Sequence, residues 1–249
     1  MGRVLDYLGE RLHRGPVHFT LIDPDKSPGD AAARIAAGAV EAGSDVILLG
    51  GSTGISPGKM GEAAQAIKRR VGAPVVIFPE GASSLTPAAD AVLFMSLLNS
   101  RNLDLVIRTH ARAAPAIRAM GLEPIPMGYL VIAPGMRVGE VGQVDAVARD
   151  DAALAAGYAL AAQFLGMQLI YLEAGSGAPS PVPADMVRTV RKTVEIPVIV
   201  GGGIRSGPDA RRLLDAGAQI LVTGTVTEEE GLGEGFQEIL KEVRAARGG

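Results

Sequence analysis

The feature that most constrains the fold is a regular alternation of short apolar runs with longer helical stretches along the whole chain. The runs are rich in Val, Ile and Leu and are apolar on both faces, which is typical of buried parallel strands. Eight strands are expected, at His18–Asp23, Asp45–Leu49, Pro74–Phe78, Ala91–Met95, within Glu123–Ile132, Leu169–Glu173, Pro197–Val200 and Gln219–Thr223.

Helical spacing of apolar residues predicts a helix between most of these strands. The expected helices cover residues 3–13, 29–42, 59–71, 104–120, 151–165, 184–193, 208–216 and 234–247. Residues 133–150 are rich in Gly and Val without a clear period, and we expect an active-site loop there. Eight strand–helix units without a linker in 249 residues predict an α/β protein with one domain over residues 1–249. The expected fold is a single (β/α)8 TIM barrel with an N-terminal helix, rather than an open doubly wound sheet.

Composition excludes several classes of protein. The net charge of −3 and the pI near 5.7 give no electrostatic footprint for nucleic acid. The chain has no cysteine, which excludes disulfides, thiolate metal sites and a cysteine nucleophile. The chain opens without the pattern of a signal peptide, and no apolar run reaches the ~18 residues that span a bilayer. We therefore expect a cytoplasmic protein.

Glycines follow the last two predicted strands. Barrel proteins build their sites from the loops at the carboxyl ends of the strands, and the loops after strands seven and eight commonly hold a phosphate. Gly201-Gly202-Gly203 and Gly224-Thr225 stand at these ends, where bare N–H groups can face an anion. A phosphate cup is the functional interpretation, and tight strand–helix turns are the structural alternative.

Carboxylates and a hydroxyl end other strands. Asp23 ends strand one, Ser52 follows strand two, and Asp25 is a second candidate ligand; this donor set suits Mg²⁺, which prefers one or two carboxylates together with substrate phosphate oxygens. An Asx-turn at Asp23-Pro24 is the alternative. Glu173 ends strand six beside the predicted cup, where a carboxylate could hold or deprotonate a substrate hydroxyl; the alternative is an ordinary salt bridge.

The three histidines suggest no catalytic centre. His13 and His110 fall in predicted helices and are expected at the surface. His18 opens strand one, at the end of the barrel away from the active face. No serine–histidine–aspartate arrangement can be assembled from them.

At these same residues the sequence resembles the geranylgeranylglyceryl phosphate synthase family. The matching motifs run in order along nearly the whole chain: Thr20–Lys26, Gly50–Gly54, Ser96–Asn102, Tyr171–Gly177, Val200–Arg205 and Val222–Thr225. The resemblance implies a modified TIM barrel that joins sn-glycerol 1-phosphate to a polyprenyl diphosphate, with geranylgeranyl as the expected chain, in membrane phospholipid biosynthesis. It further implies an Mg²⁺ ion on Asp23 and Ser52.

The same resemblance implies the substrate site. Glu173 would orient the glycerol hydroxyl and accept its proton, and Tyr171 would help to position the glycerol. The implied glycerol 1-phosphate contacts are Tyr171, Leu172, Glu173, Ala174, Gly175, Ser176, Gly177, Gly202, Gly203, Gly224 and Thr225. The prenyl tail needs an apolar groove, to which Phe78, Leu97, Leu98, Met127 and Tyr129 could contribute; barrel packing is the alternative for these five.

One position departs from the family pattern. Some members have a lysine where this chain has Leu21. Either Lys26 or backbone N–H groups take its place, or the chain belongs to the second of two branches, whose members are often dimers or larger rings such as hexamers. Transient membrane contact is also expected, since the product is lipid-like. The rival interpretations are another phosphate-binding barrel enzyme, such as a sugar-phosphate isomerase, and a non-catalytic barrel that binds a phosphometabolite.

Overall fold

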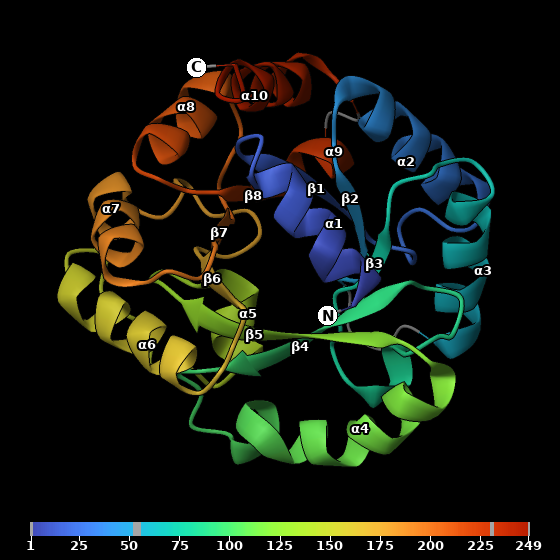
Figure 1. Cartoon of the computed structure of the whole chain (residues 1–249), viewed down its shortest axis with the longest axis horizontal. Helices are drawn as coiled ribbons and strands as arrows, with labels where there is room; N and C mark the ends of the chain where they lie inside the picture. The colour runs from blue at the N-terminus through green and yellow to red at the C-terminus, as the bar shows by residue number, and fades with distance from the viewer. Residues whose placement is uncertain (1, 52–55, 230–231, 249) are drawn as a thin grey trace.

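A closed barrel of eight parallel strands forms the centre of the molecule. The computed structural model describes residues 2–51, 56–229 and 232–248. Each strand pairs with its neighbours in sequence, and β8 returns to β1 (Figure 1). The strands are β1 (Val17–Ile22), β2 (Val46–Leu49), β3 (Val75–Ile77), β4 (Ala91–Leu97), β5 (Glu123–Val131), β6 (Leu169–Glu173), β7 (Val198–Gly201) and β8 (Ile220–Thr223).

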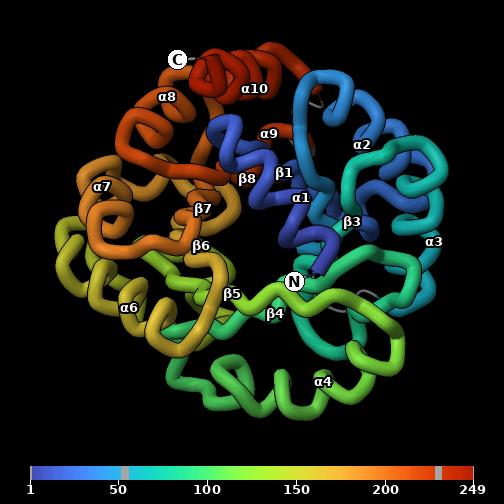
Figure 2. The backbone as a smooth tube through the Cα atoms, viewed as in Figure 1, coloured from blue at the N-terminus to red at the C-terminus, as the bar shows by residue number. Residues whose placement is uncertain are grey.

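The helices surround the barrel, most of them as an outer ring and α1 across one end, as the tube in Figure 2 also shows. In the described ranges they are α1 (Arg3–Leu12), α2 (Asp30–Ala42), α3 (Pro57–Lys68), the 3-10 turn η1 (Ala82–Ser84), the π-helical turn η2 (Asp104–Arg108), α4 (Thr109–Met120), α5 (Met136–Val141), α6 (Ala152–Phe164), α7 (Ala184–Thr193), α8 (Gly207–Asp215), α9 (Thr225–Glu229) and α10 (Glu234–Ala245).

The core has two parts because side chains alternate across each strand. One part fills the barrel interior and includes Phe19, Leu48 and Met127. The other lies between the sheet and the ring of helices, where small alanines of α2 and α6 let the helices pack closely. Residues two apart along a strand therefore share an environment, and this parity decides which side chains reach the site.

Helix α1 closes the end of the barrel where the strands begin (Figure 1). Val4 and Leu8 pack into the interior core. The Glu123 carboxylate, at the start of β5, accepts the backbone N–H groups of Val4 at 2.8 Å and Leu5 at 3.0 Å, which satisfies two of the donors that a helix start leaves unpaired. With that end closed, a ligand must enter at the carboxyl ends of the strands.

The predicted barrel is confirmed, and the differences lie in the connections. The expected loop at residues 133–150 contains α5, and α9 was not predicted at all. Both helices are too short, at six and five residues, to show a helical period in the sequence. The helix expected at residues 104–120 begins with the π-helical turn η2. Within the described residues, no helix has the length and apolar character needed to cross a bilayer.

The prediction that His110 lies at the surface is wrong. Its ring is half-buried, lies edge-on to Phe94 and has Nε2 2.7 Å from the Met95 carbonyl oxygen. His18 is fully buried, with its ring nitrogens near the hydroxyls of Ser44 (3.1 Å) and Thr223 (3.0 Å). Burial, with a smaller contribution from Arg247, lowers the pKa of His18 to about 3, so this ring is neutral at physiological pH.

Candidate active site

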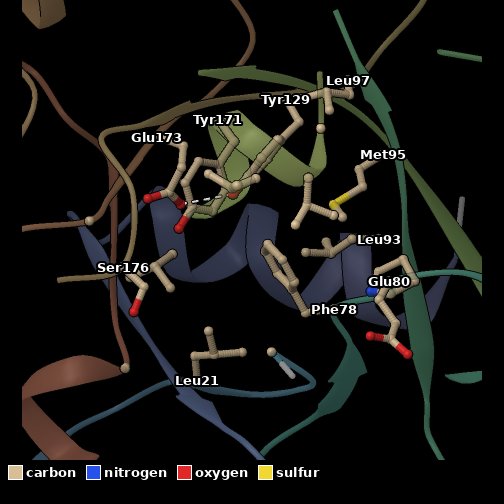
Figure 3. Close-up of a pocket in the computed structure, with 18 of the residues that line it drawn as sticks. Leu21, Phe78, Glu80, Leu93, Met95, Leu97, Tyr129, Tyr171, Glu173 and Ser176 are labelled. Atoms are coloured by element: carbon tan, nitrogen blue, oxygen red, sulfur yellow. Dashed lines mark hydrogen bonds between the residues drawn. The ribbon is translucent and has the colours of Figure 1, made fainter. Parts of the chain in front are cut away.

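A cavity of about 420 Å³ opens at the carboxyl ends of the strands. Figure 3 shows two chemically different parts. Tyr171, Glu173 and Ser176 lie on one side, and apolar side chains such as Leu93 and Met95 lie on the other. The cavity thus joins a polar site to an apolar space, and a ligand with both characters would fit it.

Glu173 lies where these two parts meet, and it is only 6% exposed. One carboxylate oxygen accepts the Gly175 backbone N–H at 2.6 Å. The other accepts the Tyr129 hydroxyl at 2.9 Å (Figure 3), and the Tyr171 hydroxyl also hydrogen-bonds this carboxylate. A carboxylate has about four acceptor sites. Three protein donors therefore leave one site for a ligand hydroxyl.

Burial and hydrogen bonding act on the Glu173 carboxyl in opposite directions. Burial disfavours the charged form and raises the pKa of Glu173, although the hydrogen bonds from Gly175, Tyr129 and Tyr171 partly offset this effect. Burial, followed by the Glu173 charge, raises the pKa of both tyrosines well above the ordinary value. Both tyrosines thus remain hydrogen-bond donors, and Glu173 is a stronger base than an exposed carboxylate.

Two glycines, the last residue of β7 and the residue after it, make room for this arrangement. A Cβ atom at Gly201 would lie 1.9 Å from the Tyr171 hydroxyl oxygen. At Gly202, a Cβ atom would lie 2.4 Å from Glu173 Oε1, and the backbone φ is +80°. These separations are far below van der Waals contact, so a larger residue at either position would displace a member of the hydrogen-bonded group.

The predicted phosphate cup lies beside Glu173. The Ser176 hydroxyl, after β6, is 2.9 Å from the Thr225 hydroxyl at the start of α9. Gly203 and Gly224 line the same cavity. Loops that are distant in sequence therefore bring together the hydroxyls and the glycine backbone that are predicted to bind a phosphate.

The eleven predicted glycerol phosphate contacts do not all face the cavity. Eight of them line it, namely Tyr171, Glu173, Ser176, Gly177, Gly202, Gly203, Gly224 and Thr225. The side chains of Leu172 and Ala174 are instead fully buried between the sheet and the helices, because they alternate with Tyr171 and Glu173 along β6. Gly175 acts through its N–H, which is directed at Glu173.

Only part of the predicted metal site lies within the described residues. Asp23 is 3% exposed and lines the cavity, and its Oδ1 accepts the Asp25 N–H at 2.9 Å, as in the Asx-turn alternative. Asp25 also pairs with Lys59 at 2.7 Å. Ser52 lies outside the described residues. Within the described ranges, no cluster of three or more His, Asp or Glu side chains could hold a metal.

Asp23 nevertheless fits the donor set of an Mg²⁺ ion that shares its ligands with a phosphorylated substrate. Its buried carboxylate faces the cavity, and Gly51 of the neighbouring loop lies against it: a Cβ atom at Gly51 would be 3.6 Å from Asp23 Oδ2. The chain leading to Ser52 therefore passes beside Asp23.

The apolar part of the cavity begins at three aromatic rings. The ring centroids of Tyr129 and Tyr171 are 4.9 Å apart, and those of Phe78 and Tyr129 are 5.8 Å apart. From the rings the cavity extends toward η2 and α4, where its walls are Leu85, Phe94, Leu105, His110, Ala113 and Ile117. His110 Nδ1 is buried there without a hydrogen-bond partner in the described part of the chain.

Only some of the five residues predicted for the apolar groove line the cavity. Phe78, Leu97 and Tyr129 line the cavity, whereas Leu98 and Met127 do not. Leu98 packs toward the helices, and Met127 lies one layer deeper in the barrel than Tyr129. The hydrogen bond from Tyr129 to Glu173 was not predicted. This hydrogen bond follows from the register of β5 and β6, which pairs Tyr129 with Tyr171. It could not be predicted, because the register between two strands cannot be read from the sequence of either strand alone.

Fold and site place the chain among the α/β barrel proteins that bind a ligand at the carboxyl ends of the strands. More particularly, the chain belongs to the PcrB family, whose model matches residues 8–246. The predicted family resemblance is confirmed by relatives named geranylgeranylglyceryl phosphate synthase. The one from Pyrococcus horikoshii is 44% identical over 249 residues, which is 100% of this chain and 97% of that protein. The one from Thermoplasma acidophilum is 48% identical over 228 residues, covering 92% of this chain and 90% of that protein.

Solved structures agree with this assignment. One is (S)-3-O-geranylgeranylglyceryl phosphate synthase from Thermoplasma acidophilum in complex with its substrate sn-glycerol-1-phosphate. It has 46% identity and a TM-score of 0.93, and the match covers 98% of this chain and 99% of that one. An N-acetylmannosamine-6-phosphate 2-epimerase from Clostridium perfringens shares only the fold, with 15% identity, a TM-score of 0.55 and coverage of 92% and 96%.

The raised pKa of Glu173 predicts a pH-dependent effect on stability. Because the folded protein holds this proton more tightly than the unfolded chain, the stabilisation is present at low pH and is lost as pH rises above the ordinary carboxyl value of 4.5. We expect Glu173→Gln, which carries no charge, to have a higher melting temperature than the wild type at about pH 8. This difference in melting temperature should shrink as the pH falls toward 4.5.

Thermal denaturation across this pH range checks the effect. Glu195→Gln is the matched control, because Glu195 is exposed and its change should leave the pH dependence unaltered. If Glu173→Gln had a melting temperature equal to or below that of the wild type at about pH 8, burial would not penalise the charged carboxylate.

Proposed function

We propose that this protein is a prenyltransferase. It joins the 3-hydroxyl of sn-glycerol 1-phosphate to C1 of a polyprenyl diphosphate, geranylgeranyl diphosphate being the first candidate, in membrane phospholipid biosynthesis. The observation that carries the proposal is the position of Glu173, between a glycine- and hydroxyl-lined cup and an apolar cavity. Relatives with this activity in their names, at 44% identity over the whole chain, support it.

Glycerol phosphate would occupy the polar part. The backbone around Gly203 and Gly224 and the hydroxyls of Ser176 and Thr225 would bind its phosphate. The 3-hydroxyl would then donate its hydrogen bond to the remaining acceptor site of Glu173. The prenyl tail would lie in the apolar part, where each buried CH₂ contributes roughly 0.8 kcal/mol before ordering costs.

The reaction exchanges one bond for another. The C1–O bond to the diphosphate breaks, and the leaving group takes the electron pair. The glycerol oxygen bonds to C1, and its proton passes to Glu173. Positive charge that develops on the allylic carbons would face the Phe78, Tyr129 and Tyr171 rings, whose π faces attract cations. The negative Glu173 carboxylate would add to this stabilisation.

A divalent cation completes the proposal. Asp23 would hold Mg²⁺, and Ser52 remains the predicted second ligand. When bound, the ion supplies positive charge to the leaving diphosphate. Separate sites for the metal-bound diphosphate and for the glycerol phosphate keep the two anions from competing for one position. A cytoplasmic location and a homo-oligomer, whether dimer or hexamer, remain predictions, as does the role of Lys26 in place of the lysine missing at Leu21.

Incubation with sn-glycerol 1-phosphate, Mg²⁺ and prenyl diphosphates of C15 to C35 tests the function. We expect an ether-linked prenylglyceryl phosphate and free diphosphate in equal amounts, with sn-glycerol 3-phosphate reacting far more slowly. Absence of the ether with every chain length would reject the activity. Equal rates with the two glycerol phosphates would reject a stereospecific site at residues 171–177.

The pH dependence of turnover tests the base. Because Glu173 must be ionised, kcat/KM should rise with pH through a pKa above the ordinary carboxyl value. Tyr129→Phe removes a hydrogen bond that stabilises the charged form, so it should move this acidic limb to higher pH. Tyr158→Phe is the control, because Tyr158 lies on α6, packs against the outer core and does not line the cavity. A limb that stays in place or moves to lower pH in Tyr129→Phe would contradict the assignment.

Two neighbouring aspartates allow a matched test of the metal site. Asp23→Asn should raise the Mg²⁺ concentration needed for half-maximal turnover by at least about tenfold, because it removes a charged ligand. Asp25→Asn should have a small effect, since Asp25 is paired with Lys59. Magnesium titrations of both variants decide the matter, and a shift only in Asp25→Asn would transfer the ligand role to that residue.

A further inference from the structure

The mouth of the cavity carries large apolar side chains that are open to solvent. Leu103, just before η2, is 47% exposed, and Ile107, on η2, is 53% exposed. Met136 and Val141, at the two ends of α5, are 37% and 55% exposed. We call these four residues the apolar rim. Exposed apolar groups that gather at one place commonly mark a surface that binds something.

The two elements of the rim meet each other. The Ser100 hydroxyl donates to the Gly142 carbonyl at 2.6 Å, and the Arg101 N–H donates to the Gln143 carbonyl at 3.0 Å. The end of α5 therefore lies beside the segment that leads into η2. Leu103 and Ile107 are four residues apart, a spacing that puts side chains on the same side of a helical turn.

The rim also reaches from the polar cup to the apolar part of the cavity. At the first end of α5, a Cβ atom on Gly175 would lie 2.6 Å from Met136 Cγ, so Met136 lies beside the loop whose Gly175 N–H donates to Glu173. At the other end of α5, Val141 itself lines the cavity, as does Leu105 of η2. An apolar chain leaving the cavity between these elements would pass directly onto the rim.

We propose that the apolar rim docks onto the surface of a lipid bilayer, so that the prenyl substrate enters, and the lipid-like product leaves, without crossing water. The purpose of this docking, which is to pass a prenyl substrate and its product, rests on the proposed function. Binding to the bilayer does not depend on that function. Four large side chains could enter the boundary between headgroups and acyl chains, as in other proteins that lie on a membrane without spanning it.

Charge at the rim is mixed, because Glu140 on α5 is exposed as well as Arg108. Arg108 is exposed and has no ion pair within the described part of the chain. By contrast, Arg112 is paired with Asp104 at 2.6 Å and Arg101 with Asp145 at 3.4 Å. Insertion of apolar side chains should therefore carry most of the binding, with Arg108 adding a preference for anionic headgroups.

Vesicle sedimentation with the purified protein tests the proposal. The vesicles are phosphatidylcholine alone or an equal mixture with phosphatidylglycerol. Leu103→Ser with Ile107→Ser should weaken binding to both kinds by at least about tenfold. Arg108→Gln should weaken it by about fivefold on the anionic vesicles only. None of these three residues lines the cavity.

The matched control is Leu154→Ser with Leu165→Ser, at positions that are 47% and 75% exposed on and just after α6, away from the cavity lining. It should bind vesicles like the wild type. The proposal would be overturned if the wild type failed to bind vesicles, or if the control variant lost binding to the same extent. It would also be overturned if light scattering showed a lower particle mass only in the Leu103 and Ile107 variant, because the rim would then be an interface between copies of this chain.

Turnover separates this proposal from the proposed function. With geranylgeranyl diphosphate in detergent, the Leu103 and Ile107 variant should be as active as the wild type, and with the same substrate in vesicles it should lose about tenfold in kcat/KM. Equal loss in detergent and in vesicles would overturn the docking role. Wild-type protein that binds vesicles through the rim but forms no ether would instead reject the proposed function alone.

Discussion

The site depends on keeping one carboxylate, that of Glu173, inside the barrel. Burying a charge is costly unless it is paired and hydrogen-bonded. Here the Tyr129 and Tyr171 hydroxyls and the Gly175 N–H surround the carboxylate. These donors make the charged form possible without removing the cost of burial, so the pKa of Glu173 remains raised. The result is a rigidly held carboxylate, which in its proposed role as the base would need little reorganisation when a substrate hydroxyl arrives.

The rest of the barrel supports this arrangement. Strands β5 and β6 place Tyr129 beside Tyr171 through their register. Strand β7 must then end in glycine, because no side chain fits beside the Tyr171 hydroxyl at Gly201 or beside Glu173 at Gly202. The glycines that the sequence predicts for phosphate binding thus also leave space for the Tyr171 hydroxyl and the Glu173 carboxylate. Helix α1 closes the opposite end by packing Val4 and Leu8 into the interior core.

The strand ends were predictable from the sequence, and the side chains that meet across strands were not. The apolar runs of β1 and β6 stop at Asp23 and Glu173, so these two residues could be assigned to the carboxyl ends directly, whereas β4 extends to Leu97, beyond its predicted end at Met95. The bond from Tyr129 to Glu173 depends on register, and the half-buried position of His110 depends on how α4 packs over β4. Neither is encoded in a local pattern.

Parity and depth explain why some residues that were named for the site do not line the cavity. Leu172 and Ala174 belong to a motif that resembles the family, yet alternation along β6 turns their side chains toward the helices. Met127 faces the barrel interior as Tyr129 does, but it lies too deep to line the cavity. The short helices α5 and α9 could not be found by period, although α5 forms the mouth of the cavity.

The most direct test of the account is an infrared titration of the Glu173 carboxyl group, by difference between the wild type and Glu173→Gln. We expect the protonated carbonyl band of Glu173 to disappear only as pH rises above the ordinary carboxyl value of 4.5, and to persist to still higher pH in Tyr129→Phe. A band that is lost at or below pH 4.5 would contradict the claim that a buried, hydrogen-bonded carboxyl group serves as the base of this site.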